Sequence, residues 1–262
     1  MKYYDAHIHL DKYEPALREE LLAVLGHDVE AVVAVSMNES SCKVNLELAQ
    51  ALPGKIYPAF GYHPELLLPR EGELESLLQW MNEHHADAAA IGEVGLPYYA
   101  RKEAEAAGQP FDLAPYIAML DQFVRLAVQL DKPIALHAVY EDAAVVCDLL
   151  ARHGCTRAHF HWFKGDQATV ERMAAHGYYI SITPDVVYEE EIRELARSYP
   201  IDLMMAETDG PWPFEGPFSG QATQPGMVRR VIEEIAAIRG LSVAATADYI
   251  ARNTRRLYRI DE

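Results

Sequence analysis

The chain has 262 residues, of which half are apolar and about a quarter are charged, a composition typical of a globular protein with a sizeable core. The formal net charge of −17 disfavours long-range attraction of polyanions, so we expect no strong nonspecific binding of nucleic acid. No apolar run reaches the roughly 18 residues that span a bilayer, and the segment Met1 to Asp5 does not resemble a secretory signal. We therefore expect no membrane contact and a cytoplasmic location.

Apolar runs rich in β-branched and aromatic residues alternate with longer amphipathic stretches along nearly the whole chain. The predicted strands are Tyr3–His9, Ala31–Ser36, Ile56–Gly61, Ala88–Glu93, Ile134–Ala138, Ala158–Trp162, Tyr178–Thr183 and Leu203–Glu207. The predicted helices are Glu14–Gly26, Cys42–Leu52, Glu73–His84, Leu113–Leu130, Asp142–His153, Gln167–His176, Glu189–Ser198 and Met227–Arg239, followed by one or two more in Ser242–Tyr258. Asp166 is a predicted N-cap, and Gly26, Gly154 and Gly240 are predicted helix ends.

This alternation predicts an α/β fold, a (β/α)8 TIM-type barrel with additional C-terminal helices, because eight strand-helix units fit the 262 residues. A doubly wound open sheet usually has fewer strands and a Gly-rich first turn, whereas the first turn here is His9-Leu10-Asp11. No Walker or GxGxxG pattern indicates nucleotide binding. We expect residues 1–262 to form a single barrel domain.

Two connections are long enough to shape a substrate pocket. One runs from Gly95 to Phe111 after the fourth predicted strand, and the other runs from Gly210 to Pro225 after the eighth. Loops that follow barrel strands lie on the face where active sites form. We therefore expect both segments to be substrate-side loops, although either can be an ordinary surface connection.

Six side chains of metal-binding type lie at or just past the ends of predicted strands: His7, His9, Glu93, His137, His161 and Asp209. A closed parallel barrel brings all these strand ends to one rim, so the six side chains can share one site. His7 and His9 project from the same face of their strand because one residue separates them. His159 has the parity of His161, and we choose His161 because it lies nearer the rim.

Each residue alone has an ordinary structural explanation, but imidazoles and carboxylates together suit one or two divalent ions such as Zn, Mg or Mn. This donor set predicts metal-assisted hydrolysis. Asp209 is the predicted general base, and Glu93, also a predicted catalytic residue, can bridge two ions. Glu207 precedes Asp209 at strand spacing and is predicted to orient a metal-binding histidine.

Several short motifs, in order along the chain, resemble those of the TatD-type metal-dependent hydrolases. They are His7-x-His9, Gly61-Tyr62-His63-Pro64, Gly92-Glu93-Val94-Gly95-Leu96, Leu136-His137, His161-x-Phe163, Glu207-Thr208-Asp209-Gly210-Pro211 and Asn253-Thr254-Arg255-Arg256-Leu257-Tyr258. The resemblance implies an amidohydrolase-like barrel with deoxyribonuclease activity. It also implies one metal among His7, His9, Glu93 and Asp209, and another among Glu93, His137 and His161. His63 would lie near the substrate phosphate, and Trp162 is a second predicted substrate contact.

The chain departs from the family pattern around the expected substrate. Pro97 stands where the family usually has Asp, Val139 where Arg is frequent, Trp162 where a small residue is common, and Gly210 where Ser is common. The loss of an arginine removes a bidentate phosphate partner. The metal residues are thus retained while the expected substrate contacts are altered.

Three functions remain open from the sequence. The first is a nuclease-like phosphodiesterase, and the second is a hydrolase of a small phosphoester, ester or amide. The third is a non-catalytic barrel with a structural metal or a partner-binding rim, against which Asp209 argues because a structural site needs no activated water. The sequence indicates no oligomeric state.

Overall fold

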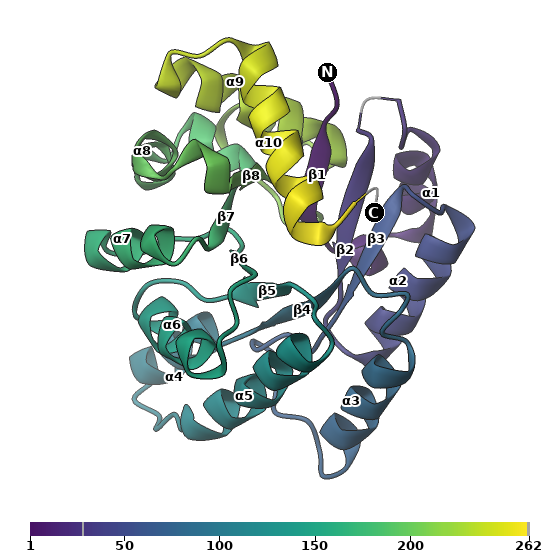
Figure 1. The fold of residues 1–262 in the computed structure, drawn as a ribbon, viewed down its shortest axis with the longest axis vertical. Helices are drawn as coiled ribbons and strands as arrows, with labels where there is room; N and C mark the ends of the chain where they lie inside the picture. The colour runs from purple at the N-terminus through teal and green to yellow at the C-terminus, as the bar shows by residue number, and fades with distance from the viewer. Residues whose placement is uncertain (28, 261–262) are drawn as a thin grey trace.

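Eight parallel strands form one sheet in the computed structural model, which describes residues 1–27 and 29–260 (Figure 1). The strands are β1 Tyr4–Ile8, β2 Ala31–Val35, β3 Ile56–Phe60, β4 Ala90–Gly95, β5 Ile134–His137, β6 Ala158–Phe160, β7 Tyr179–Ile182 and β8 Met204–Ala206. They follow one another in chain order, with Val33 opposite Tyr57 and Ile180 opposite Met204. This arrangement confirms the predicted (β/α)8 barrel.

The barrel is nearly closed where β1 meets the segment after β8. The Asp209 amide donates to the His7 carbonyl at 2.9 Å, and the His9 amide donates to the Gly210 carbonyl at 2.8 Å. Thr208 is held in the same place because its amide donates to the buried Asp5 carboxylate at 3.0 Å. These bonds bring residues about 200 positions apart in sequence to the same edge.

Helices surround the strands: α1 Pro15–Ala23, α2 Glu39–Ala51, α3 Glu73–Glu83, α4 Tyr98–Ala106, α5 Ala114–Gln129, α6 Glu141–His153, α7 Gln167–Ala175, α8 Glu190–Ser198, α9 Val228–Arg239 and α10 Val243–Tyr258. The Asp166 carboxylate caps α7 by accepting from the Thr169 amide at 2.9 Å. Gly154 and Gly240 end α6 and α9 in the left-handed conformation. Gly26 does not end α1, which stops at Ala23, and lies in the following turn.

Helix α4 corrects the expectation of a loop after the fourth strand. The segment is mostly polar and none of its residues is buried, so no core-facing apolar stripe identifies the helix in the sequence. Pro97 precedes the helix, and the Glu65 carboxylate accepts hydrogen bonds from the Tyr99 amide at 2.9 Å and the Ala100 amide at 2.7 Å. A distant carboxylate therefore satisfies amide donors in the first turn of α4.

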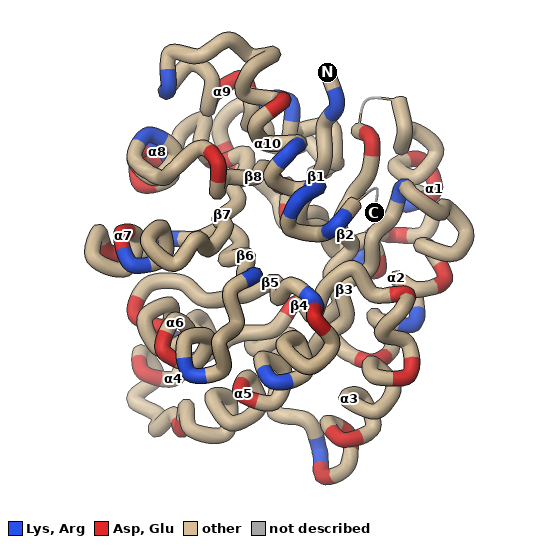
Figure 2. Tube along the Cα trace, in the orientation of Figure 1, with Lys and Arg blue, Asp and Glu red and all other residues tan. Residues whose placement is uncertain are grey.

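The C-terminal helix α10 packs on β1 and β8, and Figure 2 shows basic residues gathered along it. Arg252 pairs with the Asp202 carboxylate at 3.1 Å, and Arg256 donates to the Asp202 carbonyl at 2.8 Å and to the Tyr179 hydroxyl at 2.6 Å. These arginines contact the chain where β7 and β8 begin. The basic face of α10 therefore lies toward the strand N-termini.

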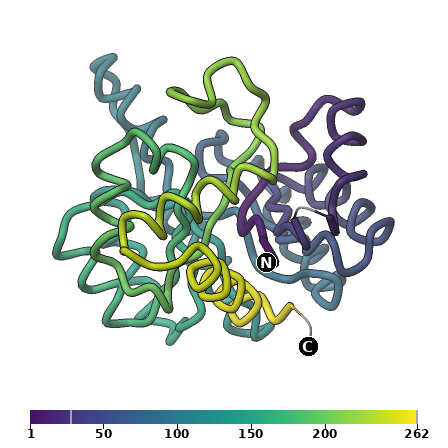
Figure 3. Tube along the Cα trace, turned by 90° about the horizontal axis from the view of Figure 1, so that it is seen from above, coloured from purple at the N-terminus to yellow at the C-terminus, as the bar shows by residue number. Residues whose placement is uncertain are grey.

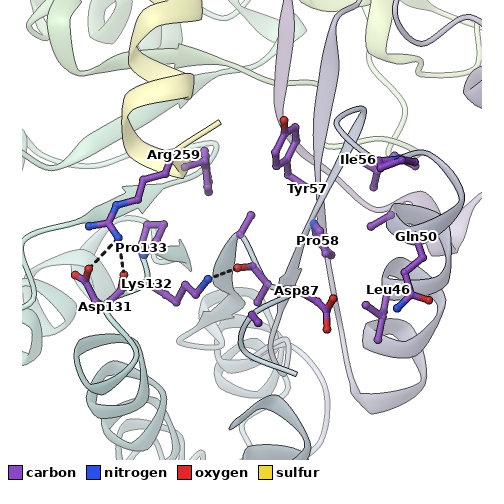
Figure 4. A pocket seen from close by; sticks show the side chains of 16 residues that line it. Leu46, Gln50, Ile56, Tyr57, Pro58, Asp87, Asp131, Lys132, Pro133 and Arg259 are labelled. Atoms are coloured by element: carbon purple, nitrogen blue, oxygen red, sulfur yellow. Dashed lines mark hydrogen bonds and ion pairs between the residues drawn. The ribbon is translucent and has the colours of Figure 1, made fainter. Parts of the chain in front are cut away.

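No helix within the described residues has the length and apolarity that crossing a membrane requires. A cavity of about 540 Å³ lies at the N-terminal ends of β3, β4 and β5 (Figure 4). In it Arg259 pairs with Asp131 at 2.8 Å, and Lys132 donates to the Ala88 carbonyl at 2.6 Å. This cavity is separate from the strand ends that carry the predicted metal residues.

Candidate metal centre

Glu93 lies at the end of β4 with no exposed surface, and its carboxylate has histidines on two sides. Its Oε2 is 3.2 Å from His7 Nε2 and 3.1 Å from His9 Nε2. Asp209 Oδ1 lies 3.4 Å from each of the same two nitrogens. One carboxylate oxygen of Glu93 thus shares a pocket with two imidazoles and a second carboxylate.

The other oxygen of Glu93 faces a different set of histidines. Oε1 lies 3.1 Å from His137 Nδ1, 2.7 Å from His161 Nε2 and 3.2 Å from His63 Nε2. His161 also stacks on His7, with ring centroids 3.9 Å apart, so it lies between the two sets. The structure therefore brings all six predicted metal residues together and adds His63 to them.

The donor atoms fit a bound cation. Three overlapping sets have ligand atoms within 4.8 Å of one another: His7, His9 and Glu93; His63, Glu93 and His137; His7, His161 and Asp209. Buried His9 Nε2 and Asp209 Oδ1 have no hydrogen-bond partner among the described residues. Buried polar atoms without a partner are costly, so nitrogens and oxygens that converge in this way indicate a place for divalent ions.

The electrostatics of the cluster favour the same conclusion. Burial alone would raise the pKa of Glu93, but the nearby histidines, His161 foremost, lower this pKa well below its usual range and keep the carboxylate charged. Burial lowers the pKa of His7 well below the ordinary value. Burial also opposes the charged form of His9, but hydrogen bonds to Asp209 and Glu93 raise the pKa of His9 to about 9. Divalent ions bound here would take the place of such protons, because a metal-binding imidazole is neutral.

Glu207 lies next to this cluster, and its role in orienting a histidine stays a prediction. Its Oε1 accepts a hydrogen bond from the Trp162 amide at 2.7 Å and lies 3.7 Å from His161 Nδ1. Its Oε2 lies 3.7 Å from His159 Nε2, and His159 is held below the centre by the Tyr258 hydroxyl and Ser181 at 2.6 Å each. His159 is thus not part of the three ligand sets, which agrees with the choice of His161.

Glu65 is a residue that the sequence reading missed. Its Oε1 lies 3.2 Å from His137 Nε2 while its two oxygens also bind the first turn of α4. Its position two residues after His63, in a segment that follows a strand, was the available signal. His63 itself was predicted as a substrate contact, and the structure places its Nε2 against Glu93.

The structure shows which residues surround three of the positions at which the chain departs from the family pattern. A side chain at Gly210 would overlap the Tyr13 hydroxyl, which donates to the Thr223 carbonyl at 2.9 Å. Val139 is buried and lines the cavity at the metal centre. Trp162 lines the same cavity and donates from its indole nitrogen to Asp185 at 2.7 Å. The cavity wall is therefore apolar at places where the family pattern has arginine or a small residue.

The cavity above the centre has a volume of about 520 Å³, within the range of about 300 to 1,000 Å³ of small-molecule sites. It is lined by His9, Met37, His63, Glu65, Leu66, Glu93, Tyr99, His137, Val139, His161, Trp162, Asp209, Trp212 and Pro213. In the described part of the chain, none of these lining residues is lysine or arginine. Positive charge at this wall can therefore come from protonated histidines or from bound cations.

A family model described as TatD related DNase matches residues 4–259. The chain belongs to the TatD family of metal-dependent hydrolases. It is 36% identical over 258 residues to an uncharacterized metal-dependent hydrolase of Haemophilus influenzae, covering 98% of this chain and 99% of that protein. It is 29% identical over 276 residues to the uncharacterized metal-dependent hydrolase YcfH of Escherichia coli, covering 98% of this chain and 96% of that protein. The crystal structure of YJJV, a TatD homologue from E. coli, superposes with a TM-score of 0.83 at 25% identity over 98% of each chain.

Membership in this family confirms the resemblance seen in the motifs. It also agrees with the cluster of histidine and carboxylate side chains that can hold metal ions. The geometry shows why the TatD motifs are so dispersed in sequence. Six of the seven motifs lie at the ends of different strands, which converge on Glu93, and the seventh, Asn253 to Tyr258, lies in α10.

Proposed function

We propose that this TatD-family hydrolase cleaves phosphodiester bonds with one or two divalent cations and with Asp209 as the general base. The observation that carries the proposal is the position of Glu93, whose two oxygens face separate groups of histidines. A carboxylate in this position can bridge two ions, an arrangement suited to in-line displacement at phosphorus. The proposed ligands of the first ion are His7, His9, Glu93 and Asp209, and those of the second are Glu93, His137 and His161, with His63 beside them.

Bound divalent ions would polarise the phosphoryl oxygen and make the attacking water more acidic. The Asp209 carboxylate accepts the proton from the water whose oxygen attacks phosphorus, and its buried Oδ1 faces the metal-site imidazoles, 3.4 Å from His7 Nε2 and from His9 Nε2. As the ester P–O bond breaks, Asp209 returns this proton to the departing oxygen. Glu207 supports the reaction by holding the Trp162 backbone beside His161.

A second candidate is the hydrolysis of a small phosphoester, ester or amide by the same centre. The cavity favours it, because no lysine or arginine lines the described wall and Val139 occupies the place of a family arginine. The arginines gathered on α10 lie at the opposite ends of the strands. A long polyanion would therefore find few cationic partners near the centre. Membership in a hydrolase family argues against the third possibility, a non-catalytic barrel.

Replacement of the proposed base tests the mechanism. We expect Asp209→Asn to lower kcat by about 100-fold or more, because an amide cannot accept the proton. Asp248→Asn, at an exposed position on α10, is the matched control and should keep full activity. Metal content is measured in both variants by elemental analysis. If metal-loaded Asp209→Asn turns over as fast as the wild type, Asp209 is not the base.

The substrate class is tested by assaying single-stranded DNA beside small phosphodiesters, carboxylic esters and amides, each with added Mn, Mg or Zn. Cleavage of the phosphodiesters supports the proposed function. If the protein cleaves carboxylic esters or amides and leaves every phosphodiester intact, the proposed phosphodiesterase function is wrong. That result would support a hydrolase of small esters or amides, as in the second candidate.

A further inference from the structure

Large aromatic side chains stand at the mouth of the metal-site cavity on two opposite sides. Tyr99 follows β4 and Trp212 follows β8, and strands four positions apart in an eight-stranded barrel face each other across the rim. Figure 3 shows α4 and the loop after β8 projecting on the same side of the molecule. Tyr99 is 49% exposed and Trp212 is 44% exposed, so both rings offer free surface next to a reactive centre.

Each ring is next to a different half of the centre. The Tyr99 ring centroid is 5.9 Å from that of His137, which faces Oε1 of Glu93. The Trp212 ring centroid is 6.4 Å from that of His9, which faces Oε2. A phosphorus centre held above Glu93 would therefore have one exposed aromatic ring on each side.

The backbones that carry these rings are fixed. Glu65 accepts from the Tyr99 amide at 2.9 Å. The Trp212 amide donates to the Asp209 carbonyl at 3.3 Å, and the Trp212 carbonyl accepts from the Thr223 hydroxyl at 2.6 Å. The backbone position of each ring is thus set before a ligand binds, and only two side-chain torsions per ring remain to be fixed when it stacks.

The charges of the cavity limit what can bind between the rings. Its described wall has three carboxylates and four histidines and no lysine or arginine. The Lys164 ammonium lies 5.8 Å from the centroid of the Trp162 ring and does not line the cavity. A phosphodiester carries a single negative charge, whereas a monoester carries up to two and a polymer repeats the charge at each unit. Away from the cations proposed at the centre, the described wall offers no lysine or arginine to further phosphate groups, which favours a short diester with a single phosphate.

We propose that the substrate is a phosphodiester with a flat, apolar-faced organic group on each side of phosphorus, one stacked on Tyr99 and the other on Trp212. This inference rests on the proposed phosphodiesterase function and names its substrate class. A monoester has one organic group and fills one of the two positions. A long polyanion extends beyond them without cationic partners.

Phosphinates test this two-sided site without hydrolysis, because their P–C bonds resist water. Binding of diphenylphosphinate, methyl(phenyl)phosphinate and dimethylphosphinate to the Mn-loaded protein is measured by calorimetry. We expect affinity to rise with each phenyl group. Tyr99→Ala and Trp212→Ala should each weaken binding of diphenylphosphinate by about 2- to 10-fold, the range for one aromatic pair, and leave dimethylphosphinate unchanged.

Tyr249→Ala is the matched control, since this tyrosine lies on α10 away from the cavity, and it should bind all three phosphinates as the wild type does. Hydrolysis of bis(p-nitrophenyl) phosphate and p-nitrophenyl phosphate is assayed in parallel. Equal affinities for the three phosphinates, with diester hydrolysis intact, would overturn the two-sided site and leave the proposed function standing. If the metal-loaded wild type cleaves neither phosphate ester, the proposed function fails first.

Discussion

The Glu93 carboxylate is fully buried and yet charged, and the histidines around it explain why both are possible. A carboxylate with no exposed surface is costly unless it is paired, and here it is ringed by imidazoles within 3.2 Å. His7 is kept neutral by burial, while attraction from the histidines keeps Glu93 ionised. The charge of Glu93 is thus balanced by nearby imidazoles, a role that bound divalent cations could also fill.

Gly210 provides a residue-scale prediction. A Cβ at this position would overlap the Tyr13 hydroxyl, so Gly210→Ala should lower the free energy of unfolding by about 1–3 kcal/mol. Tyr13→Phe removes the hydroxyl, and the double variant should therefore recover part of that loss. Chemical denaturation of all four proteins measures the coupling. Gly226→Ala, with open space around its Cβ, is the control, and equal losses at 210 and 226 would contradict the steric explanation.

At the scale of elements, α4 depends on the metal centre for its position. It has no buried residue, and its first turn donates to Glu65, whose carboxylate also lies 3.2 Å from His137. An anion at a helix N-terminus is favoured by the helix dipole. A second attachment comes from Arg101, which pairs with Asp142 at 2.6 Å at the start of α6.

Loss of the Glu65 carboxylate, which caps the first turn of α4, should loosen this helix. In Glu65→Ala we expect trypsin to cut after Arg101 or Lys102 about 5-fold faster than in the wild type, which corresponds to about 1 kcal/mol of lost capping. Glu103→Ala, at an exposed position of the same helix, is the matched control. Fragment mass identifies the cut site. An unchanged cleavage rate in Glu65→Ala would show that the ion pairs of Arg101 and Lys102 with α6 hold the helix without the cap.

At the scale of the whole molecule, the centre joins parts of the barrel that lie far apart in sequence. Its donors come from β1, from β4 to β6 and from the segment after β8, where backbone hydrogen bonds nearly close the barrel. A ligand that binds only the folded state stabilises it in proportion to the logarithm of its concentration over Kd. Metal bound at this position therefore stabilises the closed barrel.

Metal removal should lower Tm. At about 100 times Kd the stabilisation is about 2.7 kcal/mol, so we expect chelation to reduce Tm by roughly 5–10 °C. Protein purified without added ions should contain about one to two divalent ions per chain. In His7→Ala the chelator should have a smaller effect. A metal content of zero, with no change in Tm or activity when Mn, Mg or Zn is added, would contradict the metal centre.

The strands and the dispersed metal residues could be predicted because each has a short, local sequence pattern. Apolar β-branched runs mark the strands, and one intervening residue puts His7 and His9 on the same face. Parallel strands in chain order must bring their C-terminal ends together, so the predicted cluster needed only the fold class. Helix α4 was not predicted because it buries no residue, so it has no core-facing apolar pattern in the sequence.

The sequence by itself determined the alternation of eight strands and helices, the six side chains at the strand ends and the resemblance to the TatD family. Only the tertiary structure decided that His63 lies against Glu93, that Glu65 joins His137 to α4, and that Tyr13 occupies the space beside Gly210. It also placed Tyr99 and Trp212 on opposite sides of the cavity. These contacts join loops from different strands, and their distances follow from packing rather than from any periodicity along the chain.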